Sequence, residues 1–330
     1  MNNKLRGLDS LRFFAFLSVF LYHTTDKFPL GYLGVDFFFI LSSFLLTFLL
    51  YKEINAKGSF SKKNFFARRC LRIYPLYFLV VSNSLFLLPL VAAQFNIAIT
   101  LPQKKWYYLI FLSNYEPSAH IFALKFLWSI SVEEQFYIVF LLVSSLLRTH
   151  FWQTILALLT VYLSYSIVGN FYSWDTYYNV FSQLINFSTG ILLGNYFFFR
   201  GKQPRLRCVF WIFSIALMLL VVLVKLNAEA FIYRPLIAVM FAAIILFSII
   251  VGRSYNAHQY KLFRVTEWLG KYAFGLYVYS GFVITFCIKF LKYPVSVKLL
   301  LIEYAITLLV AIISFHTFEN KMLRLKRYFN

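Results

Sequence analysis

The stretch GVDFFFILSSFLLTFLL, residues 34–50, is dominated by Phe and Leu and carries a single charged side chain, Asp36. An α-helix needs about 20 mostly apolar residues to cross the hydrocarbon core of a membrane. Such runs recur along the chain, and 61% of its 330 residues are hydrophobic, against roughly 45–50% in soluble domains. The alternation typical of transmembrane β-strands does not occur. The sequence therefore predicts an all-α, polytopic membrane protein.

The hydrophobic runs predict about ten transmembrane helices. They cover residues 8–24, 34–51, 71–91, 126–147, 152–169, 180–199, 209–226, 235–252, 270–291 and 296–318. Four segments are rich in Lys and Arg: 52–70, 200–207, 253–264 and 319–330. All four lie on one side of the membrane if the N-terminus is cytoplasmic, and cytoplasmic loops carry the excess of positive charge. We therefore expect one domain over residues 1–330 in the plasma (inner) membrane, with both termini in the cytoplasm.

The formal net charge of +20 has a topological explanation. In a soluble protein it would suggest nucleic acid, but here the positive charges stand mostly in short loops. We expect membrane lipids and an anionic ligand as partners and no nucleic acid. The three cysteines, Cys70, Cys208 and Cys287, have no metal-ligand spacing, so no metal is expected. The sequence carries no signal for an oligomeric state.

Arg12 and His23 are polar residues inside the first predicted helix. Ionisable residues within membrane spans are costly and are candidates for function. Eleven residues separate the two by roughly 16 Å along a helix and return to nearly the same face. One face would thus carry a deep cation and a base near the outer end. Alternatively, Arg12 extends to the inner interface and His23 is an ordinary interfacial histidine.

The stretch LWSISVEEQFYIVF, residues 127–140, places Glu133 and Glu134 inside the fourth predicted helix. Adjacent helical residues point about 100° apart, so we expect at most one of the two carboxylates to face a buried partner. Glu133 shares a face with Tyr137, four residues later. It lies in the outer half of its helix, at a depth similar to that of His23. A carboxylate that orients a histidine is typical of general base catalysis, and a structural hydrogen bond between helices is the alternative.

The stretch RRCLRIYPLY, residues 68–77, gathers Arg68, Arg69 and Arg72 in front of an apolar run. Spacings of three and four residues put all three on neighbouring faces of a helix. The guanidinium group suits phosphate oxygens, often with two parallel hydrogen bonds. The alternative is positive loop charge that fixes topology and anchors the chain to anionic lipid.

Together these stretches resemble the acyltransferase 3 family of integral membrane acyltransferases. The similarity covers nearly the whole chain, with the motifs in the family's order. Its segments are LRGLDSLRFFAFLSVFLYH (5–23), GVDFFFILSSFL (34–45), FFARRCLRIYPLYF (65–78), LWSISVEEQFY (127–137), LGKYAFGLYVYS (269–280) and HTFENKML (316–323).

The resemblance implies ten helices with a cytoplasmic N-terminus. It also implies transfer of an acyl group, often acetyl, from cytoplasmic acyl-CoA to a hydroxyl of a carbohydrate or glycolipid at the outer face. The family's motif of arginine, ten residues and histidine maps onto Arg12 and His23. Its paired-arginine motif maps onto Arg69 and Arg72, with Arg68 beside them. The remaining motif residues are Trp128, Ser129, Ser131, Glu133, Phe318 and Glu319.

The resemblance suggests a division of roles. The CoA phosphates would bind Arg68, Arg69 and Arg72 at the inner face. His23 would take the proton from the acceptor hydroxyl, and Glu133 would orient it. Arg12 would hold the arm of the donor or polarise its thioester carbonyl.

Two departures from the family pattern stand out. Members commonly have Ser-Gly where this chain has Ser42-Ser43, and a histidine where it has Ser280. The second change removes a polar ring near the late helices and bears on the substrate class. Two rival functions remain: a carrier or flippase for a lipid-linked saccharide, and a membrane scaffold. The halves of the chain lack the paired, Gly/Pro-interrupted spans typical of inverted-repeat transporters.

Overall fold

The computed structural model describes residues 5, 7–116, 121–200, 204–254, 260–291 and 297–329. Across these residues every regular element is a helix, which confirms the all-α prediction. The α-helices are α1 (Leu8–Thr24), α2 (Leu33–Lys57), α3 (Lys62–Ser82), α4 (Leu88–Gln94), α5 (Trp106–Leu109), α6 (Phe122–Lys125), α7 (Leu127–Val143), α8 (Leu146–Thr149), α9 (Phe151–Phe171), α10 (Val180–Arg200), α11 (Leu206–Lys225), α12 (Ala230–Ser254), α13 (Lys261–Gly270), α14 (Ala273–Phe286), α15 (Val297–Ser314) and α16 (Asn320–Arg324).

Within the described ranges, eight helical stretches are long and apolar enough to cross a membrane. They are Leu33–Lys57, Lys62–Gln94, Phe122–Val143, Phe151–Phe171, Leu206–Lys225, Ala230–Gly252, Ala273–Phe290 and Lys298–Phe329. The protein is therefore a multi-pass membrane protein. The other two predicted spans are also helices, but α1 has 17 residues and α10 carries polar residues such as Gln183 and Asn186. The number ten and the cytoplasmic termini stay predictions.

The chain divides into two compact units, each built from separate stretches of sequence. Unit 1 holds Met1–Ala15, Tyr32–Phe60 and Val139–Lys271. Unit 2 holds Phe16–Gly31, Ser61–Ile138 and Tyr272–Asn330. The expectation of one domain over residues 1–330 stays a prediction.

Helices α2 and α10 of unit 1 approach so closely that their backbones touch. Side chains at Gly190 and Gly194 of α10 would collide with α2, because a Cβ at Gly190 would lie 2.3 Å from the Ile40 carbonyl oxygen. A Cβ at Gly194 would lie 2.8 Å from the Phe44 carbonyl oxygen. Glycines four residues apart permit this contact between membrane helices. Ser43, where the family commonly has glycine, fits because its hydroxyl bonds to its own helix at Phe39 O, 3.0 Å away.

Unit 1 also buries a polar cluster around Asp36 of α2. Asn186 Nδ2 donates to Asp36 Oδ1 at 2.8 Å, and the Tyr177 hydroxyl donates to Oδ2 at 3.4 Å. Arg234 of α12 lies over the Tyr177 ring, 5.2 Å from its centroid, and attracts the carboxylate electrostatically. Gln183 Nε2 donates to the Tyr177 carbonyl at 2.7 Å. Each member of this Asp36 cluster therefore has a partner within unit 1.

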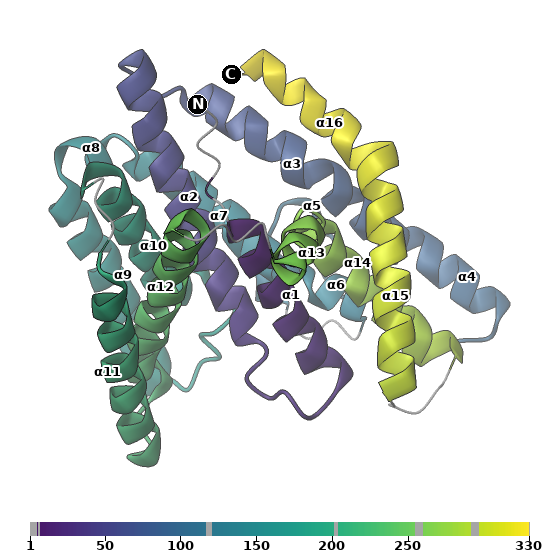
Figure 1. Ribbon diagram of the computed structural model, residues 1–330. Coiled ribbons are helices and arrows are strands. Elements are labelled where there is room, and N and C mark those ends of the chain that lie inside the picture. The colour runs from purple at the N-terminus through teal and green to yellow at the C-terminus, as the bar shows by residue number, and fades with distance from the viewer. Residues whose placement is uncertain are drawn as a thin grey trace. The chain divides into compact units, whose positions relative to one another are not determined.

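Two long helices in unit 2 extend beyond the predicted spans. Helix α3 begins at Lys62, where Ser61 Oγ accepts from the Asn64 amide at 3.3 Å. It continues through the π-helical segment η1 (Asn83–Leu87) into α4, visible as one blue helix in Figure 1. The segment 52–70 was expected to be a loop, but α2 continues to Lys57 and ends at Gly58, which adopts a left-handed φ of 74°. Only a short connection therefore separates the two helices.

The C-terminal helix of unit 2 also carries a π-helical turn. Helix α15 continues through η5 (Phe315–Glu319) into α16 and η6 (Leu325–Phe329), drawn in yellow in Figure 1. Helices α14 and α15 pack against each other, as do α3 and η6. π-Helical turns often occur at functional sites, and this one ends at Glu319, a residue of the family's Phe-Glu motif.

Residues 92–125 connect two predicted spans, and the described part of this segment folds back within unit 2 through α5, η2 (Ser113–Tyr115) and α6. Tyr108 is fully buried, and its carbonyl accepts a hydrogen bond of 2.8 Å from the Tyr77 hydroxyl. The hydroxyls of Ser113 and Ser131 lie 2.7 Å apart. The described part of this segment thus contacts α3 and α7.

Candidate active site

His23 lies in the last turn of α1, half-buried against aromatic rings of unit 2. Its ring centroid is 4.4 Å from that of Phe126 and 5.7 Å from that of Phe122. Lys125 interacts with it electrostatically. The imidazole is thus held by a short segment that leads directly into α7, the helix of the Trp-Ser-x-Ser-x-Glu motif.

Phe126 connects His23 to a hydrogen-bonded pair between α7 and α14. The hydroxyls of Ser129 and Tyr277 lie 2.7 Å apart, and the Tyr277 hydroxyl donates to the Phe126 carbonyl at 3.0 Å. The rings of Phe126 and Tyr277 are also in contact, with centroids 5.6 Å apart. The first serine of the motif therefore fixes the wall on which His23 packs.

Glu133 accepts a short hydrogen bond from the hydroxyl of Tyr137, so the prediction that they share a face is confirmed. The guanidinium of Arg69 lies over the ring of Tyr137, 5.7 Å from its centroid, and over that of Phe65 at 5.6 Å. Glu133 attracts Arg69 electrostatically. Two family motifs, one on α3 and one on α7, therefore meet at this point. The pairing of Glu133 with His23 stays a prediction.

Glu134 is the more deeply buried of the two adjacent carboxylates, and the expectation that at most one of them faces a buried partner stays a prediction. It is 4% exposed and forms a hydrogen bond with Tyr74 of α3. Its Oε1 atom is buried without a hydrogen-bond partner in the described part of the chain. The two carboxylates thus have different partners, since Glu133 accepts from Tyr137 of its own helix and Glu134 meets Tyr74 of α3. Tyr74, in the stretch RIYPLY, could have suggested a hydrogen-bond partner for Glu134, but the sequence does not show which helix Tyr74 contacts.

The three arginines lie on α3, as their spacing predicted. All are half-buried, and Arg68 Nη1 donates to the Phe329 carbonyl at 2.6 Å. Arg72 interacts electrostatically with Glu319 at the end of η5. The helix thus presents its cations toward both α7 and the C-terminal segment of unit 2.

Glu319 is part of a chain of hydroxyls to which sequence reasoning gave no role. Tyr279 donates to Ser314 Oγ at 2.8 Å, and Ser314 Oγ donates to Glu319 Oε1 at 3.1 Å. Ser280, where the family commonly has histidine, is buried and donates to the Tyr277 carbonyl at 2.8 Å. Its hydroxyl is therefore satisfied by its own helix.

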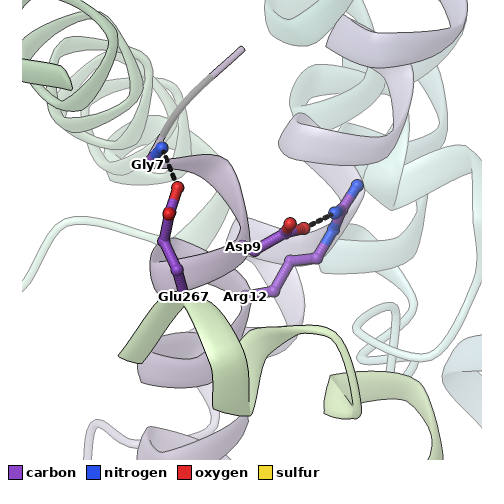
Figure 2. A network of polar contacts seen from close by, with 4 residues as sticks. All are labelled: Gly7, Asp9, Arg12 and Glu267. Carbon is purple, nitrogen blue, oxygen red and sulfur yellow. Dashed lines mark hydrogen bonds and ion pairs between the residues drawn. The ribbon is translucent and has the colours of Figure 1, made fainter. Parts of the chain in front are cut away.

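Arg12 lies near the start of α1, in the part that belongs to unit 1 (Figure 2). It forms an ion pair with Asp9, one turn earlier. Figure 2 shows this pair and, as a separate contact, Glu267 of α13, which accepts from the Gly7 amide at 3.0 Å. One helix carries both Arg12 and His23, as predicted. Their roles stay predictions. Among the described residues, no group of three or more His, Cys, Asp or Glu side chains is placed to hold a metal ion.

Comparisons with known proteins agree with the motifs. A family model described as an acyltransferase domain matches residues 5–316. The chain is 28% identical to the O-acetyltransferase OatA of Staphylococcus aureus (strain NCTC 8325 / PS 47) over 341 residues, which cover 96% of this chain and 57% of that protein. It is 36% identical over 148 residues to a protein named as an O-acetyltransferase in Staphylococcus aureus (strain COL), covering 41% of this chain and 24% of the relative.

The chain thus spans about half or less of the length of these relatives. No solved structure matches it significantly. The family match nevertheless extends over nearly the whole chain and includes Arg12, His23, Arg68, Arg69, Arg72 and Glu133. The chain belongs to the acyltransferase 3 family of integral membrane acyltransferases.

Proposed function

We propose that this protein transfers an acyl group, most simply acetyl, from cytoplasmic acyl-CoA to a hydroxyl of an envelope or exported carbohydrate or glycolipid. Family membership and relatives named as O-acetyltransferases support this reaction class. The structural observation that carries the proposal is the meeting of two motifs in unit 2. Arg69 of α3 lies over Tyr137 of α7, whose hydroxyl donates to Glu133.

The donor end of the proposed site is the arginine cluster, defined as Arg68, Arg69 and Arg72. CoA carries several phosphate oxygens, and guanidinium groups bind such oxygens strongly. If the termini are cytoplasmic, the cluster faces the compartment in which acyl-CoA is made. The half-buried position of the three side chains strengthens their electrostatic attraction for phosphate.

The chemical step begins at the acceptor hydroxyl. His23 takes its proton while the oxygen attacks the thioester carbonyl, and the carbon–sulfur bond of the donor breaks. The products are the acylated acceptor and CoA, which leaves as its thiol after receiving a proton. Glu133 stabilises the imidazolium that forms in between, and Arg12 keeps its predicted role toward the donor.

The cellular setting follows from the same chemistry. A multi-pass protein that uses cytoplasmic acyl-CoA and modifies an exported glycan belongs in the plasma membrane. The partners are then the glycan acceptor and the surrounding lipids.

The decisive experiment uses the purified full chain in detergent or lipid nanodiscs with acyl-labelled acetyl-CoA. We expect release of free CoA and transfer of label to an acceptor, both lost in His23→Ala. Mass spectrometry of envelope glycans, with and without the gene, identifies the acceptor by a shift of one acyl mass. Saccharide movement across a vesicle membrane without turnover of acetyl-CoA would instead favour a carrier.

A further inference from the structure

Lys326 adds a fourth cation to the arginine cluster. It belongs to η6, which packs against α3 in unit 2. The Arg68 hydrogen bond to the Phe329 carbonyl, 2.6 Å long, ties the two elements together. Lys326 is half-buried, and Arg68, Arg69 and Arg72 all act on it as repelling charges. Segments more than 250 residues apart in the sequence thus bring four positive charges to one place.

The charge balance differs among these cations. Glu133 attracts Arg69, and Glu319 and Arg72 attract each other. The charged groups that act on Lys326, by contrast, are all cations. Within the described residues its ammonium has no hydrogen-bond or ion-pair partner. Lys326 therefore differs from Arg69 and Arg72, each of which has a carboxylate neighbour.

Holding an ammonium among like charges, partly out of water, costs free energy. A surface lysine could avoid this cost by swinging into solvent, but η6 packs on α3 and keeps this one close to the arginines. An anion bound in front of the four cations would reverse the sign of the interaction. Phosphate is the best match, because it accepts from several donors at once and lysine binds it as a compact charge.

We propose that Lys326 is a donor-binding residue whose ammonium contacts a phosphate of acyl-CoA alongside the arginine cluster. This inference rests on the proposed function and adds the C-terminal segment of unit 2 to the donor site. The C-terminal segment would then contribute to the donor site in two ways. Its backbone carbonyl positions Arg68, and its lysine contacts the ligand.

The test measures the affinity of the purified full chain for CoA and for 3′-dephospho-CoA by titration calorimetry. Lys326→Gln should weaken CoA binding about tenfold, the size of one charge-assisted hydrogen bond. Lys326→Arg should restore most of the affinity. Arg324→Gln and Arg327→Gln are matched controls, because both residues are exposed and neighbour Lys326 in the chain. They should bind CoA like the parent. If only Lys326→Gln loses the preference of the protein for CoA over 3′-dephospho-CoA, Lys326 contacts the 3′-phosphate. If Lys326→Gln weakens binding of both ligands equally, Lys326 contacts the diphosphate.

Thermal unfolding without ligand separates a binding role from a structural one. Removing a repelled charge should leave the melting temperature of Lys326→Gln unchanged or raise it, while the stabilisation by added CoA shrinks. A lower melting temperature with normal CoA affinity would assign Lys326 to packing and overturn the inference. Lipid phosphate is the other source of the same chemistry. Loss of stabilisation by anionic lipid in nanodiscs, with CoA affinity intact, would equally overturn it.

The inference and the proposed function fail in different ways. If Arg69→Lys weakens CoA binding and Lys326→Gln does not, the donor site stands without Lys326. If the parent protein does not bind CoA at all, the proposed function itself is wrong.

Discussion

The Asp36 cluster of unit 1 and the arginine–glutamate region of unit 2, defined as the arginine cluster with Glu133, Glu134 and Lys326, both hold polar side chains that are buried or half-buried among apolar helices, yet they are built differently. Around Asp36, the carboxylate oxygens accept from Asn186 and Tyr177, and Arg234 supplies an opposite charge. Among the described residues of unit 2, Glu134 Oε1 lacks a hydrogen-bond partner, and the charged groups that act on Lys326 are cations.

This difference in hydrogen bonding suggests a structural role for the Asp36 cluster and a functional role for the region in unit 2. A buried polar group that is fully satisfied specifies how helices pack, whereas an unsatisfied one retains a capacity that a ligand can fill. We therefore expect changes in unit 2 to affect turnover and donor binding, and changes at Asp36 to affect stability.

The largest effect is expected at His23. His23→Ala should lower turnover at least about 1000-fold, because general base catalysis supplies factors of this order. The variant should still enter the membrane and bind CoA, since its ring contacts lie apart from the arginine cluster. Labelled acetyl transfer and CoA titration on the same preparation measure both. Normal turnover would exclude His23 from the mechanism.

The two adjacent glutamates give the next largest effect. Glu133→Gln should lower turnover about 100-fold, because an amide keeps the shape but does not stabilise an imidazolium. Glu134→Gln should have a smaller effect, since its role is the hydrogen bond to Tyr74. Should Glu134→Gln be the more damaging change, the carboxylate that supports the base would have to be Glu134.

Smaller effects are expected for charge-conserving changes in the arginine cluster. Arg69→Lys and Arg72→Lys keep the charge but lose the planar fork, so CoA affinity should fall about tenfold. Binding should also weaken with rising salt, because phosphate contacts near water are screened. The measurement is CoA titration at two salt concentrations. Unchanged affinity in both variants would leave the cluster as a topological anchor.

The smallest catalytic effect is expected at Asp36. Asp36→Asn removes the opposite charge from Arg234 and should destabilise the protein by about 1–3 kcal/mol. Turnover per folded molecule and CoA affinity should stay close to those of the parent. Thermal unfolding alongside the transfer assay checks this prediction. A selective loss of turnover at normal stability would place Asp36 in the reaction and break the comparison between the two regions.

The sequence pattern predicted the placement of site residues correctly where those residues lie on a single helix. Arg12 and His23 share α1, the arginines share α3, and Glu133 meets Tyr137 one turn away. The sequence pattern did not predict contacts between segments that are distant along the chain. Sequence alone does not pair Glu134 with Tyr74, fold the 92–125 segment back onto α3, or bring Lys326 to the arginines. Those contacts depend on how helices pack, which hydrophobic periodicity in an apolar chain does not encode.

The backbone contact between α2 and α10 has a mechanical consequence. Because Gly190 and Gly194 leave no side-chain layer between the helices, one cannot slide or rotate past the other without a collision of main-chain atoms. The two helices must therefore move together as one rigid body during the slow, collective motions by which membrane enzymes admit and release large molecules. A covalent link between α2 and α10 should therefore leave the rate of such motion untouched, and the joints that permit it must be sought in other parts of the chain.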